Sequence, residues 1–388
     1  MKYHFLSLPI ICLLAFSTGC KKKTEINYQP TPAGNTLNGS TTKGDLASVL
    51  KSAALKPEVF TVNATTGGKF TSSKGLTYTI DPGIFLKPDG QTAQGTVSVE
   101  VSEITKASEM ILNDMPTNAI TTPVDSARKD TVKIQKPQEV GGMLNSFGEI
   151  KVEASQNNEE LELKPDAEIK VQIPQPAVPE PILPMETVQT WENHPVSGNG
   201  LIGHNSENEN VTGEITNFEK CGIWKIIPQV CIPHVNENNV QCLNMEIPKL
   251  DVWFNSDILI VTPRQTTVLG YFTNVFNDNE TADALQGRQA NMLFFKKKGD
   301  NTLIKLFNHI LNAADGKKGF LSVQQSFGIG MEGTFLALVS KDGKFYAEKK
   351  AVTIAEPASG KNFVGINFTL KEITESQMLA LIETMNNE

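Results

Sequence analysis

The sequence lacks the motifs of several common catalytic classes. It contains no HExxH, which excludes a zincin-type protease, and no GxSxG, the usual signature of serine hydrolases. It also has no GxxxxGKS or GxxxxGKT phosphate loop, and no GxGxxG between a strand and a helix. Histidine is scarce, with 5 in 388 residues. We therefore expect a protein without catalytic activity and without a bound cofactor.

Basic charge is in deficit as well. Lysine and arginine number 35 against 43 aspartate and glutamate residues, which gives a formal net charge of -8. Binding of DNA or RNA needs a basic surface, so we exclude nucleic acid as a partner. Long apolar runs are missing beyond the N-terminal region, where no segment offers the roughly 18 uninterrupted apolar residues of a membrane span.

The N-terminal region does carry a short apolar run, at residues 5–16. It predicts a signal peptide at 1–19, because about 12 residues of helix rise roughly 18 Å and a bilayer core is about 30 Å thick. The following STGC resembles a bacterial lipobox, although Ser17 stands where leucine is common. We expect acylation, for example with palmitate, at Cys20 and an outer-membrane lipoprotein that faces the periplasm or the cell surface. The alternative is an ordinary secretory signal.

The segment after Cys20 is rich in Thr, Gly, Asn and Pro and poor in large apolar residues. Such a segment buries too little surface to offset the entropy of ordering it. We therefore predict a flexible tether at 20–50 that holds the protein on the membrane.

Only three cysteines remain once Cys12 and Cys20 are set aside with the signal peptide and the lipid. These are Cys221, Cys231 and Cys242. An oxidising compartment favours one disulfide among them, and the spacing leaves all three pairings open. The spacing does not match a CxxC zinc site.

Alternation of apolar and polar residues predicts an all-β protein. Val97, Val99 and Val101 share one strand face, and Ile169, Val171 and Ile173 share another. Asp-Gly at 342–343 predicts a hairpin over 335–354, and 105–115 predicts a helical turn or a bulged loop. Thr374 and Gln377 form a capping box that starts a C-terminal helix. Five prolines within 174–184 and the polar stretch 192–214 predict an extended connection and a loop.

Two segments, 75–117 and 140–174, carry a family resemblance. Their features are Pro82-Gly83, Gly95-Thr96-Val97, EMIL at 109–112 and GGM at 141–143. They resemble the ZU5-like β-sandwich region of secreted and lipid-anchored proteins from Bacteroidota-type bacteria. The resemblance implies a two-layer, Ig-like sandwich. ZU5 domains of animal proteins serve as interaction modules, and some cleave themselves at His-Phe-Ser, which this sequence lacks.

These patterns divide the chain into five parts. We predict the signal peptide at 1–19, the tether at 20–50 and a ZU5-like sandwich at 51–190. A connecting loop region with the cysteine cluster follows at 191–248, and a second sandwich with the C-terminal helix at 249–388. The fold we expect is two β-sandwiches in tandem.

Metal-binding residues are few. Asp278, Glu280 and Asp283 alternate in an acidic stretch and are weak candidates for calcium, but the EF-hand spacing fails. His194 and His204 share one polar loop. For both stretches we favour solvated loops and expect no metal. Trp191 and Trp224 are expected at the interface between the domains, and Trp253 in a core.

We expect a lipid-anchored extracytoplasmic module that presents sandwich loops to a protein or glycan partner. One alternative is a polysaccharide-acting hydrolase with carboxylates between the domains. Another is a calcium-stabilised adhesin, whose melting would respond to a chelator.

Overall fold

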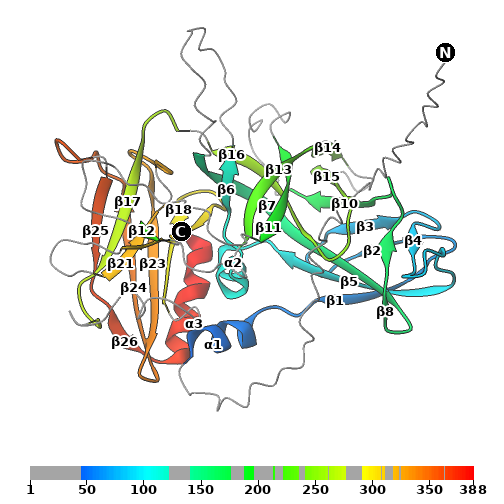
Figure 1. Cartoon of the computed structure of the whole chain (residues 1–388), viewed down its shortest axis with the longest axis horizontal. Helices are drawn as coiled ribbons and strands as arrows, with labels where there is room; N and C mark the ends of the chain where they lie inside the picture. The colour runs from blue at the N-terminus through cyan, green and yellow to red at the C-terminus, as the bar shows by residue number, and fades with distance from the viewer. Residues whose placement is uncertain are drawn as a thin grey trace, which may run out of the picture. The chain divides into compact units, whose positions relative to one another are not determined.

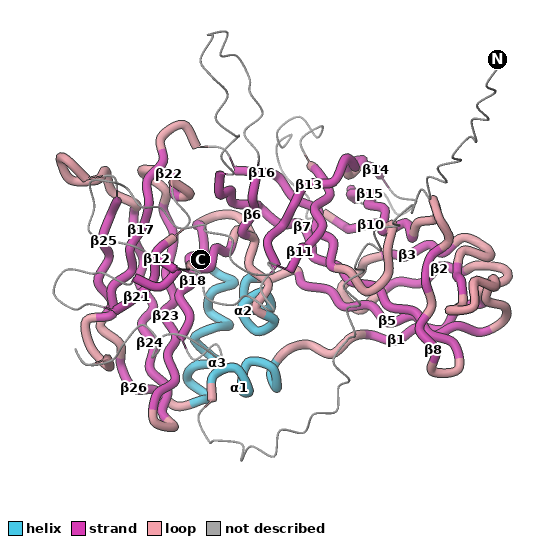
Figure 2. Tube along the Cα trace, in the orientation of Figure 1, coloured by secondary structure: helices cyan, strands magenta, loops and turns pink. Residues whose placement is uncertain are grey.

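The fold comes from a computed structural model that describes residues 45–121, 140–175, 188–195, 213–214, 222–235, 241–260, 262–276, 291–306, 308–310, 318–322, 325–361 and 363–388. These residues form 26 strands and three α-helices. Figure 2 colours the strands and helices along the chain. The all-β prediction is therefore confirmed. None of the helices in the described residues is long and apolar enough to cross a membrane.

Residues 58–260, which we call the N-terminal half, contribute an eight-stranded sheet in the order β1-β5-β7-β16-β11-β13-β6, with β8 added to β7. Figure 1 labels its strands. The bounds are Glu58–Asn63 (β1), Thr96–Ile104 (β5), Asn118–Thr121 (β6), Val140–Gln156 (β7), Glu159–Glu160 (β8), Gln189–Pro195 (β11), Gly222–Val230 (β13) and Trp253–Ile260 (β16). A five-stranded sheet has the order β14-β15-β10-β3-β2. Its bounds are Gly68–Thr71 (β2), Thr77–Ile80 (β3), Ile169–Pro174 (β10), Ile232–Val235 (β14) and Gln241–Ile247 (β15). A two-stranded sheet pairs β4 (Phe85–Leu86) with β9 (Glu162–Leu163).

The first hydrophobic core joins these sheets. Val97, Val99 and Val101 of β5 are buried in one cluster with Ile169, Val171 and Ile173 of β10. The two predicted apolar faces are thus confirmed, and they pack in the same core. Each fully buried Val or Ile side chain stabilises the fold by roughly 1.5–3 kcal/mol relative to exposure.

Two further sheets are formed mainly by strands after residue 262, and we call residues 262–388 the C-terminal half. A six-stranded sheet has the order β12-β20-β21-β17-β22, with β25 paired to β17. Its bounds are Gly213–Glu214 (β12), Gln265–Phe272 (β17), Asn308–Ile310 (β20), Lys318–Leu321 (β21), Phe327–Gly328 (β22) and Phe363–Phe368 (β25). A five-stranded sheet has the order β19-β18-β23-β24-β26. Its bounds are Asn291–Lys297 (β18), Leu303–Lys305 (β19), Glu332–Lys341 (β23), Lys344–Thr353 (β24) and Lys371–Ile373 (β26). Phe272 of β17 and Phe295 of β18 share a second core.

The predicted hairpin over 335–354 is confirmed by β23 and β24. Lys341 pairs with Lys344, so Asp342 and Gly343 form a two-residue turn. Both turn residues have positive φ, 52° and 74°. Asp-Gly tolerates this backbone, and the turn fixes the register of the whole pair.

The helices gather beside one another (Figure 1). The predicted helical turn is α2 (Ala107–Asn113), and the predicted C-terminal helix is α3 (Glu375–Glu383). The Thr374 side chain accepts from the Gln377 amide, and Gln377 reaches back to the Thr374 amide, so the capping box is confirmed. Buried side chains of both helices belong to a third core, which also contains residues of β18 and β23.

The tether was predicted to extend through residue 50, but its last residues are helical. Helix α1 spans Leu46–Ala53, and Asp45 caps it by accepting from the Ser48 amide at 3.2 Å. Leu46, Val49 and Leu50 are buried in the third core. These apolar residues lie at the spacing of one helix face, and that pattern outweighs the polar composition around it.

The described residues of 191–248 are mostly in strands, where we predicted a connecting loop region. This segment contains strands β13, β14 and β15 and most of β11. Prolines and asparagines break the alternation locally, but partner strands distant in sequence, such as β10 for β15, supply the pairing. Strand β16 lies within 249–388, yet it pairs with β7 and β11 of the first sheet. Strand pairing therefore crosses the position predicted as a domain boundary.

Candidate functional site

Two of the three cysteines predicted to form a disulfide are described, and both Cys231 and Cys242 are buried. The Cys231 thiol is free. Its sulfur accepts a hydrogen bond from Ser256 Oγ at 3.0 Å and lies 3.4 Å from Thr190 Oγ1. Burial raises the pKa of Cys231, which keeps the thiol protonated and unreactive. Neither pairing that includes Cys231 is formed, and the remaining pairing involves Cys221, which lies outside the described residues.

The other predicted site residues lie outside the described residues. They are Cys20, the histidine His204 and the weak calcium candidates Asp278, Glu280 and Asp283. His194 lies on β11, where we had predicted a loop. Nearby Glu192 forms an ion pair with Lys249, with 2.9 Å between Oε2 and Nζ. Lipidation of Cys20 therefore stays a prediction, and calcium binding stays an untested alternative.

The tryptophans occupy cores rather than a binding surface. Trp191 and Trp224 are fully buried in the third core, beside residues of α2 and β18, which agrees with an interface position. Trp224 Nε1 donates to the Pro116 carbonyl at 2.9 Å. Trp253 packs against the same core and is partly buried.

A cleft of about 520 Å³ opens where the β7–β8 hairpin meets the turn between β15 and β16. Its apolar residues include Leu161, Leu163 and Leu250, which pack against the first core. Its acidic residues are Glu153, Glu160, Glu162 and Asp251. We call this site the acidic cleft.

Local backbone geometry positions the walls of the acidic cleft. Asn157 and Asn158 both have positive φ, 56° and 67°, and form a tight turn between β7 and β8. The Leu161 amide then donates to the Ala154 carbonyl at 2.9 Å, which holds the returning chain beside β7. On the other wall, the Asp251 amide donates to the Val152 carbonyl at 2.8 Å.

Negative charge dominates the acidic cleft. Among the described residues that line it, four carry carboxylates and one, Lys249, carries an ammonium group. Lys249 is already paired with Glu192, and Lys151 lies between Glu153 (2.8 Å) and Asp251 (3.3 Å). Among the described residues, Glu160 and Glu162 form no ion pair, and both are exposed. These two carboxylates are therefore available to a cationic group from solution.

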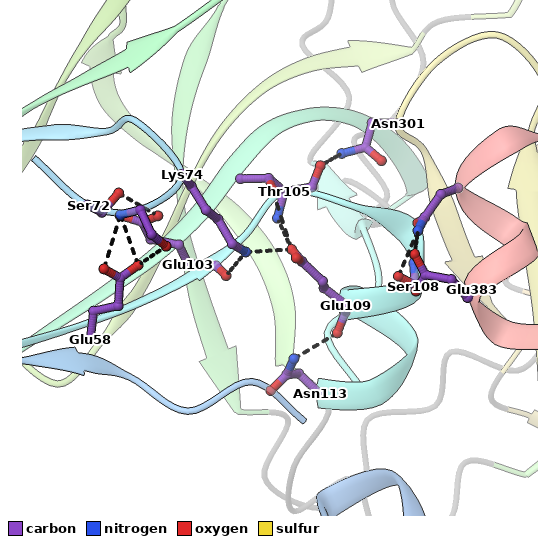
Figure 3. Close-up of polar contacts among 12 residues, drawn as sticks. Glu58, Ser72, Lys74, Glu103, Thr105, Ser108, Glu109, Asn113, Asn301 and Glu383 are labelled. Carbon is purple, nitrogen blue, oxygen red and sulfur yellow. Dashed lines mark hydrogen bonds and ion pairs between the residues drawn. The ribbon is translucent and has the colours of Figure 1, made fainter. Parts of the chain in front are cut away.

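A second polar feature lies between β5 and α2, and Figure 3 shows it. Lys74 Nζ donates to Glu109 and to the Glu103 carbonyl, both at 2.7 Å. The Thr105 amide also donates to Glu109, and Asn301 Nδ2 donates to the Thr105 carbonyl at 3.1 Å. We call this set the polar network. Because Asn301 belongs to the loop before β19, the network ties the two halves of the chain together.

The carboxyl of Glu103 anchors the other end of the polar network. Tyr78 Oη donates to it at 2.7 Å and Ser72 Oγ at 3.0 Å. Burial raises the pKa of Glu103, and these two hydrogen bonds partly offset the rise. Burial and the neighbouring Glu103 raise the pKa of Tyr78. Since its carboxylates have protein partners, we interpret the network as structural rather than ligand-binding.

The comparisons with known proteins give no relative: no protein-family model, no curated protein and no solved structure matches this chain.

Sequence reasoning did not single out the acidic cleft. A signal existed in the stretch EASQNNEELEL at 153–163, where an Asn-Asn turn is followed by glutamates that alternate with leucines. This pattern predicts a hairpin with apolar residues on one side and carboxylates on the other. The remaining acidic residue, Asp251, is brought to the cleft only by pairing between distant strands.

Proposed function

We propose that this protein is a non-catalytic, extracytoplasmic binding module that uses the acidic cleft to hold a cationic segment of a partner protein. The observation that carries the proposal is that two exposed carboxylates, Glu160 and Glu162, lie in the same cleft as apolar side chains. Such a site suits a chain in which lysine or arginine lies beside an apolar side chain. None of the described residues that line the cleft is aromatic, which favours a protein partner over a glycan.

The proposal includes an N-terminal lipid on Cys20 that anchors the module to the outer membrane. Support comes from the apolar run and the lipobox-like STGC. The tether would then run to Asp45, where α1 begins and packs into the third core. A flexible chain of this length, about 25 residues, spans roughly 25–30 Å. The cleft would thus act close to the membrane surface.

The finer fold proposal is a tandem of two β-sandwiches, the first ZU5-like and Ig-like. Two observations support it. The first core combines side chains of the eight-stranded sheet and a five-stranded sheet. The second core combines side chains of β17 and β18, from the two sheets of the C-terminal half. In this arrangement the acidic cleft would be built by connections of the first sandwich, in keeping with loops that present a binding surface.

The test uses a synthetic peptide of alternating lysine and leucine as the probe. We expect it to bind the mature protein at low salt, and we expect the double variant Glu160→Gln/Glu162→Gln to bind it at least about tenfold more weakly. The matched control is Glu375→Gln, which removes an exposed carboxylate at the start of α3. Equal binding by all three proteins would overturn the cleft as the binding surface.

A polysaccharide-acting hydrolase is the second candidate, favoured by the several carboxylates that line one cleft. Reducing-end release from a panel of soluble polysaccharides separates the two. Release that is lost in the Glu160→Gln/Glu162→Gln variant would replace the binding proposal with the enzyme.

The anchor is tested separately by mass spectrometry of the mature N-terminus in the native protein and in Cys20→Ala. Acyl chains on Cys20 are expected, and an unacylated mature N-terminus would refute the anchor alone.

A further inference from the structure

Two carboxyl groups lie buried on adjacent strands of the eight-stranded sheet. Glu149 is on β7 and Asp257 on β16, and Glu149 is registered opposite Asn255. Asn255 and Asp257 are two positions apart, so they share one face of β16. The register with β7 shifts between these two positions, so Asp257 pairs with Ser146, but the charge of Asp257 still acts on Glu149 and the two carboxyls are therefore close enough to interact. We call Glu149 and Asp257 the carboxyl pair.

Both side chains of the carboxyl pair are 0% exposed, and among the described residues none of their four oxygens accepts a hydrogen bond of good geometry. The Ser146 hydroxyl and the Phe147 amide lie close to Asp257 and favour its ionised form, but Glu149 has no such neighbour. Unpaired donors lie in the same layer: Trp191 Nε1 and Asn255 Nδ2 are also buried without an acceptor. The Ser146 hydroxyl donates to Asn255 Oδ1 at 2.8 Å. A polar cluster of this kind is stable only with neutral members, since an unpaired buried charge is very costly.

Cations around the carboxyl pair are engaged elsewhere. On the α2 side, Glu109 adds a third carboxylate, and the nearby Lys74 is held by Glu109 and the Glu103 carbonyl. On the β19 side, Lys305 forms a buried ion pair with Asp114 at 2.6 Å. On the β11 side, Glu192 is registered opposite Phe254 of the first core and is neutralised by Lys249. Each of these lysines is already paired with a carboxylate, so these described groups offer the pair no net positive charge.

Packing separates the carboxyl pair from bulk water. Leu144 of β7, Ile104 of β5 and Trp191 of β11 belong to the third core, together with residues of α2, β18 and β23. Asn301 also donates to the Ser146 carbonyl at 3.2 Å, next to the pair. The carboxyl pair therefore lies under the contact between the eight-stranded sheet and the C-terminal half.

We propose that the carboxyl pair is a proton-binding site that holds the two halves of the chain together: it retains at least one proton in the folded protein at neutral pH, and its ionisation loosens their contact. Burial raises the pKa of both groups, and the neighbouring Asp257 raises the pKa of Glu149 further. The Ser146 hydroxyl and the Phe147 amide offset only part of the rise at Asp257. In the unfolded chain both carboxyls ionise in the ordinary range, so unfolding at neutral pH releases protons.

The sign of the pH effect follows from this proton release. Where the folded state binds more protons than the unfolded state, stability falls as pH rises. The contribution of the pair is therefore fully present below the unfolded pKa values and is lost as pH rises through the raised folded ones. We expect the urea midpoint of the protein to increase as pH is lowered from about 8 to about 5.

The experiment measures protons directly. Urea unfolding at neutral pH in weak buffer should release about one more proton from the native sequence than from Glu149→Gln or Asp257→Asn. The infrared spectrum of the folded protein should show the carbonyl stretch of a protonated carboxylic acid, and either variant should lose it. Glu100→Gln is the matched control, since it removes a half-buried carboxyl on β5 and should leave both readouts unchanged.

The infrared measurement on the native protein keeps the test decisive if a variant fails to fold. A folded native protein without the protonated carboxyl band at neutral pH would overturn the proposal. So would a urea midpoint that rises with added calcium and falls with chelator in the native sequence but not in Glu149→Gln. That result would make the pair a cation site instead.

Discussion

Strand β7 carries acidic residues in two opposite environments. Glu149 is buried beneath the C-terminal half, and Glu153 lies at the acidic cleft, where its side chain is 37% exposed. The two residues are an even number of positions apart on one strand, so a regular pleat places them on one face. At one end of this face the third core covers the sheet, and at the other end solvent reaches it. Under the two proposals above, the same residue type therefore retains a proton at one end of β7 and adds negative charge to the acidic cleft at the other.

The largest expected effect comes from adding a carboxyl to each environment. Asn255→Asp places a third acid between Glu149 and Asp257, whereas Asn158→Asp adds one in the exposed turn of the β7–β8 hairpin. We expect the free energy of unfolding at neutral pH to fall by about 3 kcal/mol or more for Asn255→Asp, because a buried unpaired acid must be protonated. Asn158→Asp should change it by less than about 0.5 kcal/mol.

Urea denaturation at pH 7 and pH 5 checks this contrast. The loss for Asn255→Asp should shrink at the lower pH, where protonation is easier. Equal losses for the two variants would mean that water reaches the carboxyl pair, and the contrast between the two ends of β7 would fail.

The polar network provides an intermediate case, a buried carboxyl that does have partners. Tyr78→Phe removes the 2.7 Å hydrogen bond to Glu103. We expect a loss of about 1–3 kcal/mol in the free energy of unfolding, since the acceptor stays buried. The pKa of Glu103 should rise further, so the stability of the variant should increase more steeply on acidification than that of the native protein. Tyr346→Phe on partly buried β24 is the control, and a loss of similar size there would argue against the Glu103 contact.

These cases show which features the sequence could predict. Val97, Val99 and Val101, the Asp342-Gly343 turn and the Thr374 capping box depend on neighbouring residues, and all three features are present in the structure. The burial of Glu149 cannot be predicted from its neighbours in the sequence. The alternation with Ile150 correctly predicts that Glu149 faces away from the first core, but that pattern alone would place its side chain in solvent.

The difference arises from contacts between distant parts of the chain. Strand β16 joins the first sheet although more than fifty residues separate it from β11. Helix α2 and the loop that carries Asn301 then cover the outer face of that sheet. Periodicity within a strand says which residues share a face, but it does not say what covers that face. The carboxyl pair and the acidic cleft both depend on that second fact.

A smaller effect is expected from the one ammonium group in the acidic cleft. Lys249→Gln leaves Glu192 without its ion-pair partner, and the free energy of unfolding should fall by up to about 1 kcal/mol. Binding of the lysine–leucine probe should become severalfold tighter, because the cleft becomes more negative. Fluorescence titration at two salt concentrations measures the change. Lys344→Gln, which breaks an exposed pair with Glu372, is the control and should not alter binding.

The smallest expected effect on stability is that of Glu160→Gln/Glu162→Gln, and this near-absence of change is informative. Both carboxylates are exposed and form no ion pair among the described residues, so their loss should change the free energy of unfolding by less than about 0.5 kcal/mol. The same variant should bind the probe weakly, which separates binding from folding at this end of β7. A loss of stability comparable with that of Tyr78→Phe would mean that the cleft carboxylates hold the hairpin in place, and weaker binding would then reflect a damaged fold. Unchanged stability with weaker binding would leave the charge of the cleft as the cause, since neither side chain has another contact with a described residue whose loss explains it.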